Sequence, residues 1–508
     1  MKRNVVFLLI LALLISLVPL GVGLADDAVD VPTIEVYVPG PWVASPLPPA
    51  GEDIYQNFFN ETFGANFVLT FSTEGGAEMM TRFAANNPPD LLPLSNGDLN
   101  MLYDQGLLLA DWTPYLDAMP LTTVNMGDLG RKFFTRNDNL ICIPAMPGEQ
   151  AFSFMIRKDW LEALDLAMPT TTAELLEVLK AFTFNDPDGN GQDDTFGITS
   201  AGGGKGVGEL SSMLLFFGGP NFYIGEDGEV THPILAGYYK DYLDFFKEII
   251  DAKVIDPDWY TQGWEERKPA LFSNTGKYGV CWYPPAALVE EMQSFRHDDA
   301  VVDWWGVMGM LEGAQPAWPI YGTIRTVSAA AGEDAAKMEK IVAFLEGLAV
   351  PNEAYYSARH GVGIDNMNMK DFNGMKYLHY DPNDFIQKSS QEGAYLATAV
   401  WGQPINVPAP FDGVFFGITP EPERATLGAM EMTKQVLDAP TWPAEYRMLN
   451  PDPTINEEVN TLVNEFAINY IIGKETDYEQ FVETWKYSGG EDLLESAIAT
   501  FKDYGLIP

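Results

Sequence analysis

The sequence predicts an α/β protein built from at least two lobes. Short apolar segments typical of strands alternate with amphipathic helical segments from Pro32 onward. Of the 508 residues, 46% are hydrophobic and 13% are aromatic, which is enough to fill large cores. A chain of this length exceeds what one hydrophobic core normally supports, so more than one lobe is expected.

The first lobe begins with strands and helices in strict alternation. The segments expected to form strands are 33–38, 67–72 and 88–94, and the helices are 51–64, 75–87 and 97–106. This order predicts a parallel sheet with helical crossovers, because parallel neighbours need long connections. Ligands of such sheets lie beyond the carboxyl ends of the strands, which here are followed by the loops 39–49 and 95–97.

A second lobe is expected to start near residue 149. Its predicted elements are a strand at 152–156, a short helix at 157–166, helices from 172 and at 238–252, and an aromatic strand at 277–283. Thr171 and Glu174 have the spacing of a capping box at a helix start. Further along, 304–310 and 324–331 are predicted strands, 333–349 is a predicted helix, and the residues from Asn456 onward are predicted to be helical.

The N-terminus has the pattern of a secretory signal peptide. Lys2 and Arg3 precede an apolar run at 5–15, and small residues surround a cleavage site after Ala25. Residues 1–25 are therefore predicted to be a signal peptide, and the protein is predicted to be exported to the periplasm or the cell surface. No cysteine follows the apolar run, so a lipid-modified N-terminus is not expected, whereas retention of the segment as an anchor stays open.

Charge and cysteine content limit the partners. The formal net charge of -42 repels phosphates, so nucleic acid and anionic lipid surfaces are unlikely partners, while cations are attracted. Cys142 and Cys281 lie in apolar strand-like runs, and either a disulfide or two buried free thiols is consistent with export.

The segment 154–199, "FMIRKDWLEALDLAMPTTTAELLEVLKAFTFNDPDGNGQDDTFGIT", resembles the extracellular solute-binding proteins of bacterial ABC sugar importers, a family that includes maltose- and alginate-oligosaccharide-binding proteins. The segments 88–117 and 269–288 are similar to it more weakly. The resemblance implies a two-lobed periplasmic-binding-protein-like fold with discontinuous lobes, a hinge and an interlobe ligand cleft. The first lobe would be 26–148 with about 303–350, and the second 149–302 with about 351–508. It also implies a monomer that binds a carbohydrate and delivers it to the permease subunits of an ABC importer.

Aromatic residues at strand ends are the first candidates for a sugar site, since sugars stack their C–H faces on rings. Trp282, with Tyr283, ends the strand 277–283 at the place where the family has a stacking tryptophan, although core packing is the alternative. The other aromatic candidates for ligand contact are Trp42, Trp318, Tyr321 and Trp401. Trp112, Trp160, Trp259 and Trp442 are expected in cores.

Polar candidates lie in the loops near the expected cleft. Ser95, Asn96 and Asp98 follow the third strand, and Glu149 and Gln150 follow the first crossing between lobes. Their side chains offer the donors and acceptors that hydroxyl groups need, but helix capping and solvation explain them equally well. Arg157 either reaches the cleft or pairs with Asp159.

The loop "NDPDGNGQDD" predicts a structural calcium site. The side chains of Asp186, Asp188, Asn190 and Asp194 occupy positions one, three, five and nine of an EF-hand-like spacing, and the main-chain carbonyl of Gln192 occupies position seven. Position twelve is Gly197 and not the usual Glu, so a calcium sensor is excluded and the sixth ligand is not assigned. A solvated acidic turn is the alternative.

No catalytic motif is present in the sequence. The four histidines lie far apart, and neither a nucleophile elbow nor a phosphate loop occurs. A non-enzymatic carbohydrate receptor is therefore the leading hypothesis. The alternatives are a secreted glycoside hydrolase or lyase, which would need two carboxylates about 5 to 10 Å apart, and a receptor for a solute other than a sugar.

Overall fold

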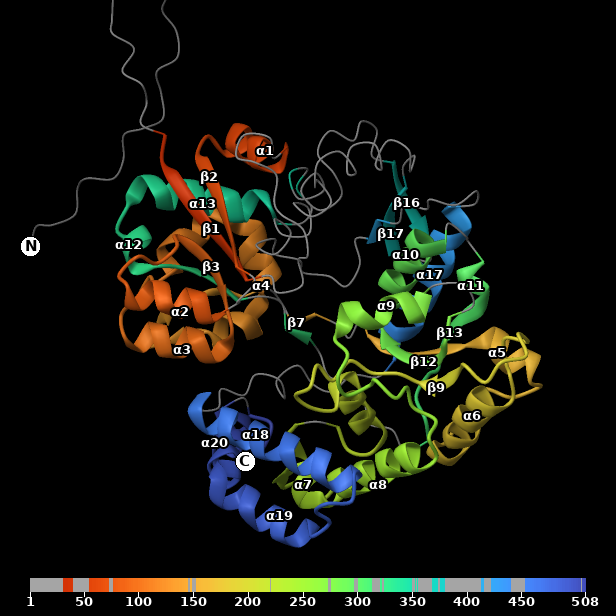
Figure 1. Cartoon of the computed structure of the whole chain (residues 1–508). Coiled ribbons are helices and arrows are strands. Elements are labelled where there is room, and N and C mark those ends of the chain that lie inside the picture. The colour runs from red at the N-terminus through yellow and green to blue at the C-terminus, as the bar shows by residue number, and fades with distance from the viewer. Residues whose placement is uncertain are drawn as a thin grey trace, which may run out of the picture.

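The computed structural model (Figure 1) describes most of the chain. The described residues are 31–39, 54–72, 76–144, 147–148, 152–219, 221–272, 276–296, 300–312, 320–321, 324–349, 352, 354, 368–372, 375–379, 413–414, 422–439, 453–503 and 505–508. The predicted signal peptide lies outside them. Within the described residues, no helix has both the length and the apolar character needed to cross a bilayer.

The first lobe is built on a five-stranded sheet in the order β2-β1-β3-β15-β6. Its strands are β1 (Thr33–Pro39), β2 (Asn66–Ser72), β3 (Leu91–Leu94), β6 (Ile143–Pro144) and β15 (Ile324–Val327). β1 pairs in parallel with β2 and β3, as the alternation of strands and helices predicts, while β15 runs antiparallel to β3 and β6. The α/β class is confirmed.

Helices cover this first sheet and share one core with it. They are α1 (Ile54–Phe63), α2 (Gly76–Ala84), α3 (Asn96–Asp104), η1 (Thr113–Ala118), α4 (Pro120–Phe133), α12 (Ala329–Gly332) and α13 (Ala335–Gly347). Figure 1 shows α13 lying over β1 and β2 although some 270 residues separate them in sequence. The strand predicted at 324–331 is shorter, because Ser328 caps α12 through a 3.4 Å bond from the Ala331 amide.

The second lobe contains a four-stranded sheet in the order β13-β8-β12-β9. These strands are β8 (Ser153–Arg157), β9 (Phe196–Ile198), β12 (Tyr278–Tyr283) and β13 (Trp305–Val307). β8 runs antiparallel to both β12 and β13, and β9 runs parallel to β12. Separate apolar cores cover the two faces of this sheet.

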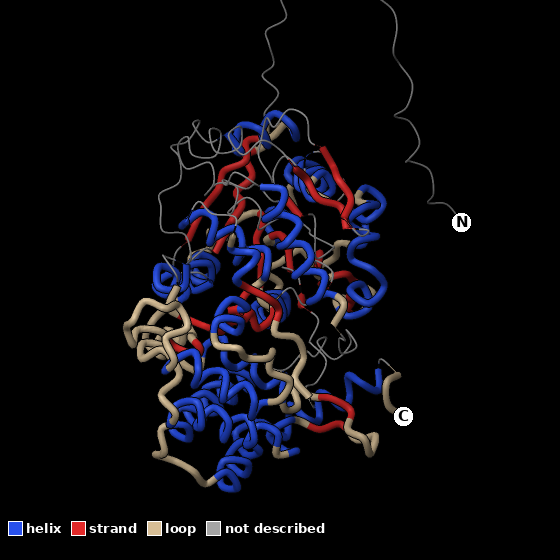
Figure 2. The backbone as a smooth tube through the Cα atoms, turned by 90° about the vertical axis from the view of Figure 1, so that its right-hand side faces the viewer, coloured by secondary structure: helices blue, strands red, loops and turns tan. Residues whose placement is uncertain are grey.

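The larger core lies between the sheet and α5 (Lys158–Ala163), α6 (Thr172–Phe184), η2 (Gly208–Phe216), α7 (Pro233–Ala236), α8 (Tyr238–Asp251), α18 (Pro453–Ile471), α19 (Tyr478–Trp485), η4 (Lys486–Gly490) and α20 (Glu491–Asp503). The smaller core lies between the sheet and α9 (Trp264–Phe272), α10 (Pro285–Arg296), α11 (Val301–Trp304) and α17 (Pro422–Leu437). In Figure 2 the C-terminus lies in the lower, mostly helical half of the molecule, and α20 contacts the first lobe, because Lys132 Nζ of α4 donates to the main-chain carbonyl of Asp503 at 2.7 Å.

Short paired strands lie between the two sheets. β7 (Pro147–Gly148) pairs antiparallel with β14 (Ile320–Tyr321), and the chain enters this pair from β6 and leaves it toward β15 (Figure 1). The return to the first lobe was predicted near residue 303. That boundary is wrong, because β13 is hydrogen-bonded to β8 in the second sheet, and the chain rejoins the first sheet only at β15.

Small strand pairs complete the described structure. They are β4 (Thr135–Arg136) with β5 (Asn139–Leu140), β10 (Tyr223–Ile224) with β11 (Val230–Thr231), and β16 (Asn368–Phe372) with β17 (Met375–His379) and β18 (Gly413–Val414). Cys142 and Cys281 are free thiols buried in different cores, which is the second of the two sequence alternatives.

Candidate functional site

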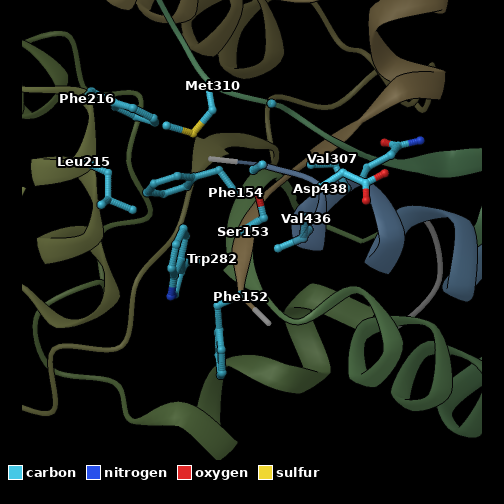
Figure 3. Close-up of a pocket in the computed structure, with 13 residues that line it drawn as sticks. Phe152, Ser153, Phe154, Leu215, Phe216, Trp282, Val307, Met310, Val436 and Asp438 are labelled. Atoms are coloured by element: carbon cyan, nitrogen blue, oxygen red, sulfur yellow. The ribbon is translucent and has the colours of Figure 1, made fainter. Parts of the chain in front are cut away.

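A pocket of about 390 Å³ opens at one edge of the second sheet (Figure 3). Thirteen residues line it: Phe152, Ser153, Phe154, Leu215, Phe216, Trp282, Val307, Gly309, Met310, Gln435, Val436, Asp438 and Ala439. They come from the start of β8, the end of β12, the residues around the end of β13, the end of η2 and the end of α17. The pocket therefore gathers segments that are nearly 290 residues apart in sequence.

Strand direction explains why these segments meet. Because β8 is antiparallel to β12 and β13, its first residues lie beside the last residues of both neighbours: Phe154 pairs with Trp282, and Ser153 pairs with Tyr283. The same edge is where the chain enters the second sheet from β7 and leaves it toward β14. The pocket thus lies at the edge of the sheet nearest the crossings between lobes.

Four aromatic rings form a continuous aromatic wall, defined here as Phe152, Phe154, Phe216 and Trp282. The ring centroids are 6.2 Å apart for Phe152 and Trp282, 4.8 Å for Trp282 and Phe154, and 5.1 Å for Phe154 and Phe216. Phe154 and Phe216 are buried, whereas Trp282 is only partly buried. The indole of Trp282 is thus held by its neighbours while part of it stays available at the pocket.

Tyr283, unlike its neighbour Trp282, does not line this pocket. Neighbouring residues of a strand point to opposite faces of the sheet, and Tyr283 is fully buried in the smaller core. Its ring stacks on Trp264 at 4.7 Å and meets Phe272 edge to face at 5.6 Å. Burial raises the pKa of the Tyr283 phenol.

The polar part of the pocket is small. Ser153, Gln435 and Asp438 are the lining residues with hydrogen-bonding side chains other than the indole. The carboxylate of Asp438 accepts two bonds from Lys434 Nζ, at 2.8 and 2.7 Å. The residues from α17 were not identified from the sequence, because they follow a long stretch without a motif and only the tertiary fold brings them to β12.

Arg157 pairs with Asp159, the second of its two sequence alternatives. The guanidinium donates to both carboxylate oxygens, at 2.7 and 2.5 Å, and is nearly inaccessible to solvent. It also lies 4.4 Å from the ring centroid of Trp160 and 5.2 Å from that of Trp304. Arg157 stands at the far end of β8 from the pocket and is not among its lining residues.

The polar candidates of the first lobe act locally in the structure. Ser95 caps α3 by accepting a 3.0 Å bond from the Asp98 amide, and its hydroxyl donates to the Asp98 carboxylate at 2.7 Å. Asn96 starts the helix. The Ser95 bond matches the capping alternative, and neither Ser95 nor Asp98 lines the pocket, while of Asn96 only the backbone is described.

Several candidates lie where side chains are not described. Trp42, Glu149, Gln150, Trp318 and Trp401 fall outside the described residues. Of Tyr321 only the backbone is described, and it pairs with Pro147 in the crossing strands.

The acidic loop after α6 folds around Asn190. The Asn190 backbone N–H donates to Asp186 Oδ1 at 3.1 Å, and its side-chain amide donates to Asp188 at 2.8 Å and to Asp194 at 3.1 Å. Its side-chain oxygen accepts a 2.7 Å bond from the Gln192 backbone N–H. Gly191 adopts φ of +76°, which allows the sharp turn. Thr195 donates to the Phe182 carbonyl and is buried, so its hydroxyl faces away from the loop.

Hard oxygen donors of this kind fit calcium better than softer metals. In the described part of the chain, however, no three acidic, histidine or cysteine side chains are arranged to hold a metal ion. Lys277 Nζ lies 3.7 Å from the carboxylate of Asp194 in this loop.

Residues 46–345, more than half of the chain, match the family model of the bacterial extracellular solute-binding proteins. The polygalacturonan/rhamnogalacturonan-binding protein YtcQ of Bacillus subtilis is 25% identical over 357 residues, which are 68% of this chain and 67% of that protein. The fold is that of the Streptococcus pneumoniae substrate-binding protein FusA, solved with kestose, with a TM-score of 0.67 at 16% identity over 94% of this chain and 99% of that one.

It is also that of the alginate-binding protein AlgQ2, solved without calcium ion, with a TM-score of 0.65 at 15% identity over 93% of this chain and 98% of that one. These likenesses agree with the architecture of two α/β lobes joined by crossing strands. They also agree with the resemblance drawn from the segment 154–199. The chain therefore belongs to the bacterial extracellular solute-binding proteins, a family of binding proteins and not of enzymes.

Proposed function

We propose that this protein is the receptor of an ABC importer and captures a saccharide in the pocket beside Trp282. The observation that carries the proposal is the partly exposed indole, which is fixed by Phe154 at 4.8 Å at the edge of the sheet nearest the lobe crossings. An aromatic face in this position suits the C–H face of a sugar ring. The same ligand class is supported by the similar proteins: YtcQ binds polygalacturonan or rhamnogalacturonan, FusA was solved with kestose, and AlgQ2 binds alginate.

The pocket does not favour the hydrolase alternative. Glycosidases of the common type place two carboxyl groups about 5 to 10 Å apart at the scissile bond. Asp438 is the one carboxylate among the thirteen lining residues, and Lys434 holds it in an ion pair. Delivery to a membrane importer and export across the membrane follow from the same family membership, and the signal peptide at 1–25 remains a prediction from sequence.

A thermal-shift screen tests the receptor function. The purified protein is heated with a panel of neutral and acidic mono- and oligosaccharides, and a true ligand raises the melting temperature because it binds only the folded state. The same samples are assayed for new reducing ends. Release of reducing ends from any glycan would contradict a receptor, and a panel without any stabilising sugar would favour the alternative of a non-sugar solute.

We also propose that calcium binds in the acidic loop through Asp186, Asp188, Asn190, Asp194 and the Gln192 carbonyl. The support is the set of three carboxylates that converge on Asn190 and accept from its backbone and side-chain N–H groups. A bound cation would offset the repulsion among these carboxylates and tie α6 to β9.

Chelation tests the calcium proposal. EGTA should lower the melting temperature of the wild type by roughly 2–4 °C, whereas Asp186→Asn should start lower and no longer respond to EGTA. Asp227→Asn is the matched control, because Asp227 also caps a surface turn, through a 3.0 Å bond from the Glu229 amide. This control should keep the full EGTA response. An unchanged wild-type melting temperature in EGTA would leave a solvated acidic turn as the explanation.

A further inference from the structure

The walls of the pocket are unusually apolar for a saccharide site. Nine of its thirteen lining residues carry aromatic or aliphatic side chains without a carboxylate, amide or hydroxyl group: Phe152, Phe154, Leu215, Phe216, Trp282, Val307, Met310, Val436 and Ala439. A sugar hydroxyl group that faces these apolar side chains loses its hydrogen bonds to water, and the side chains offer no hydrogen bonds in return. The lining therefore favours a ligand that has an apolar group of its own.

Charge in and around the pocket disfavours an anionic ligand. None of the thirteen lining residues is a cation. Lys434, one turn before Asp438, is bonded to both oxygens of that carboxylate, and Arg157 is bonded to Asp159. The end of α17 adds the partial negative charge of a helix C-terminus, where Gln435 and Val436 line the pocket. Among the described lining residues, a uronate would meet a carboxylate that repels it and no counter-ion.

The size of the pocket limits how much of a saccharide it holds. Its volume of about 390 Å³ is near the lower end of the roughly 300–1,000 Å³ typical of ligand pockets. One sugar unit with a small substituent is compatible with that space, whereas a longer chain would extend beyond it.

We infer, building on the proposed receptor function, that this pocket selects an uncharged sugar unit bearing an apolar group, such as the methyl group of a 6-deoxy sugar. Met310 is placed to contact that group. It follows β13, its side chain is 40% exposed, and in Figure 3 it points toward Phe216 and Phe154. The aromatic wall binds the ring, and the aliphatic residues Val307, Met310 and Val436 provide the apolar surroundings for the substituent.

Nine monosaccharides test the selection directly. Galactose, glucose and mannose are each compared with the 6-deoxy sugar and the uronic acid of the same configuration, so that members of a set differ only in CH2OH, CH3 or carboxylate at C6. Titration calorimetry at millimolar sugar should give, in at least one set, 6-deoxy binding at least about four-fold tighter than the parent, the equivalent of burying one methyl-sized group. The uronate of that set should bind at least ten-fold more weakly than the 6-deoxy sugar.

Two matched variants separate specificity from folding. Met310→Gln keeps the length of the side chain but adds an amide, and it should reduce the 6-deoxy preference below about two-fold. Met168→Gln is the control, since Met168 is 36% exposed and does not line the pocket. It should keep the preference of the wild type, and both variants should retain the wild-type melting temperature.

The outcomes distinguish this inference from the receptor function. Equal or tighter binding of a uronate, or equal binding of 6-deoxy and parent sugars in every set that binds, overturns the selection and leaves the receptor intact. Failure of all nine monosaccharides, when an oligosaccharide stabilises the protein in the thermal-shift screen, overturns it as well, because the pocket is sized for one unit. Failure of every saccharide in both experiments removes the proposed function itself.

Discussion

At the scale of single residues, the ends of strands decide what the site contains. Trp282 and Tyr283 are adjacent, yet the first lines the pocket and the second is buried in the opposite core. The two-residue period of a strand separates them, whereas the prediction from sequence offered both residues as ligand contacts. The choice between the faces required the position of the surrounding helices.

We interpret the buried charge of Arg157 as stabilising the fold and not as binding the ligand. Asp159→Asn should lower the free energy of unfolding by roughly 1–3 kcal/mol, because two hydrogen bonds to a charged group weaken inside a nearly solvent-free site. Chemical denaturation measures this cost. Affinity for any saccharide that stabilises the wild type should be unchanged, and a loss of affinity without a loss of stability would return Arg157 to the ligand site.

At the scale of elements, local signals identified helices well and missed long-range partners. Thr171 caps α6 through a 3.1 Å bond from the Glu174 amide, as its spacing predicts, and the Glu174 carboxylate reaches back to accept a 2.8 Å bond from the Thr170 amide. α8 spans Tyr238–Asp251, close to the predicted 238–252. By contrast, no local pattern could indicate that the end of α17 completes a pocket begun by β8, because that contact depends on the packing of the whole lobe.

The short helix α7 contains a group that makes stability depend on pH. Its N-cap, His232, accepts a 3.2 Å bond from the Ile234 amide and stacks on Trp485, with ring centroids 5.2 Å apart. Burial lowers the pKa of His232 from 6.5 to about 3. The His232 side chain therefore takes up a proton near pH 6.5 in the unfolded chain, whereas in the folded chain it stays neutral until the pH approaches 3. Its stabilising contribution is complete above pH 6.5 and is lost as the pH falls toward 3.

His232→Asn tests this dependence, since Asn keeps the capping oxygen but does not titrate. Between pH 7.5 and 5.5 the wild type should lose roughly 1 kcal/mol of unfolding free energy through His232, and the variant should lack that part of the slope even though the loss of ring stacking makes it less stable overall. Urea denaturation at the two pH values measures the difference. If the free energy of unfolding changes equally in both proteins between the two pH values, His232 is not held in its neutral form by burial.

At the scale of the whole molecule, the lobes and their crossings determine where a ligand can bind. The second sheet presents the ends of β12 and β13, together with the start of β8, at the edge from which the chain passes to the first lobe through β7 and β14. Composition predicted two lobes and the resemblance predicted discontinuous ones. The boundary at 303 was misplaced because β13 is an apolar strand that suits either sheet, and only pairing with β8 assigns it to the second.

The most direct test of the receptor account is the affinity of Trp282→Ala for a saccharide that stabilises the wild type. Loss of the stacking face should weaken binding roughly ten- to hundred-fold in titration calorimetry, while the circular dichroism spectrum stays that of the wild type. Trp304→Ala is the control, because Trp304 is also a partly buried tryptophan but lies beside Arg157 and outside the pocket, so its affinity should remain that of the wild type. Unchanged affinity in a folded Trp282→Ala protein would contradict the account.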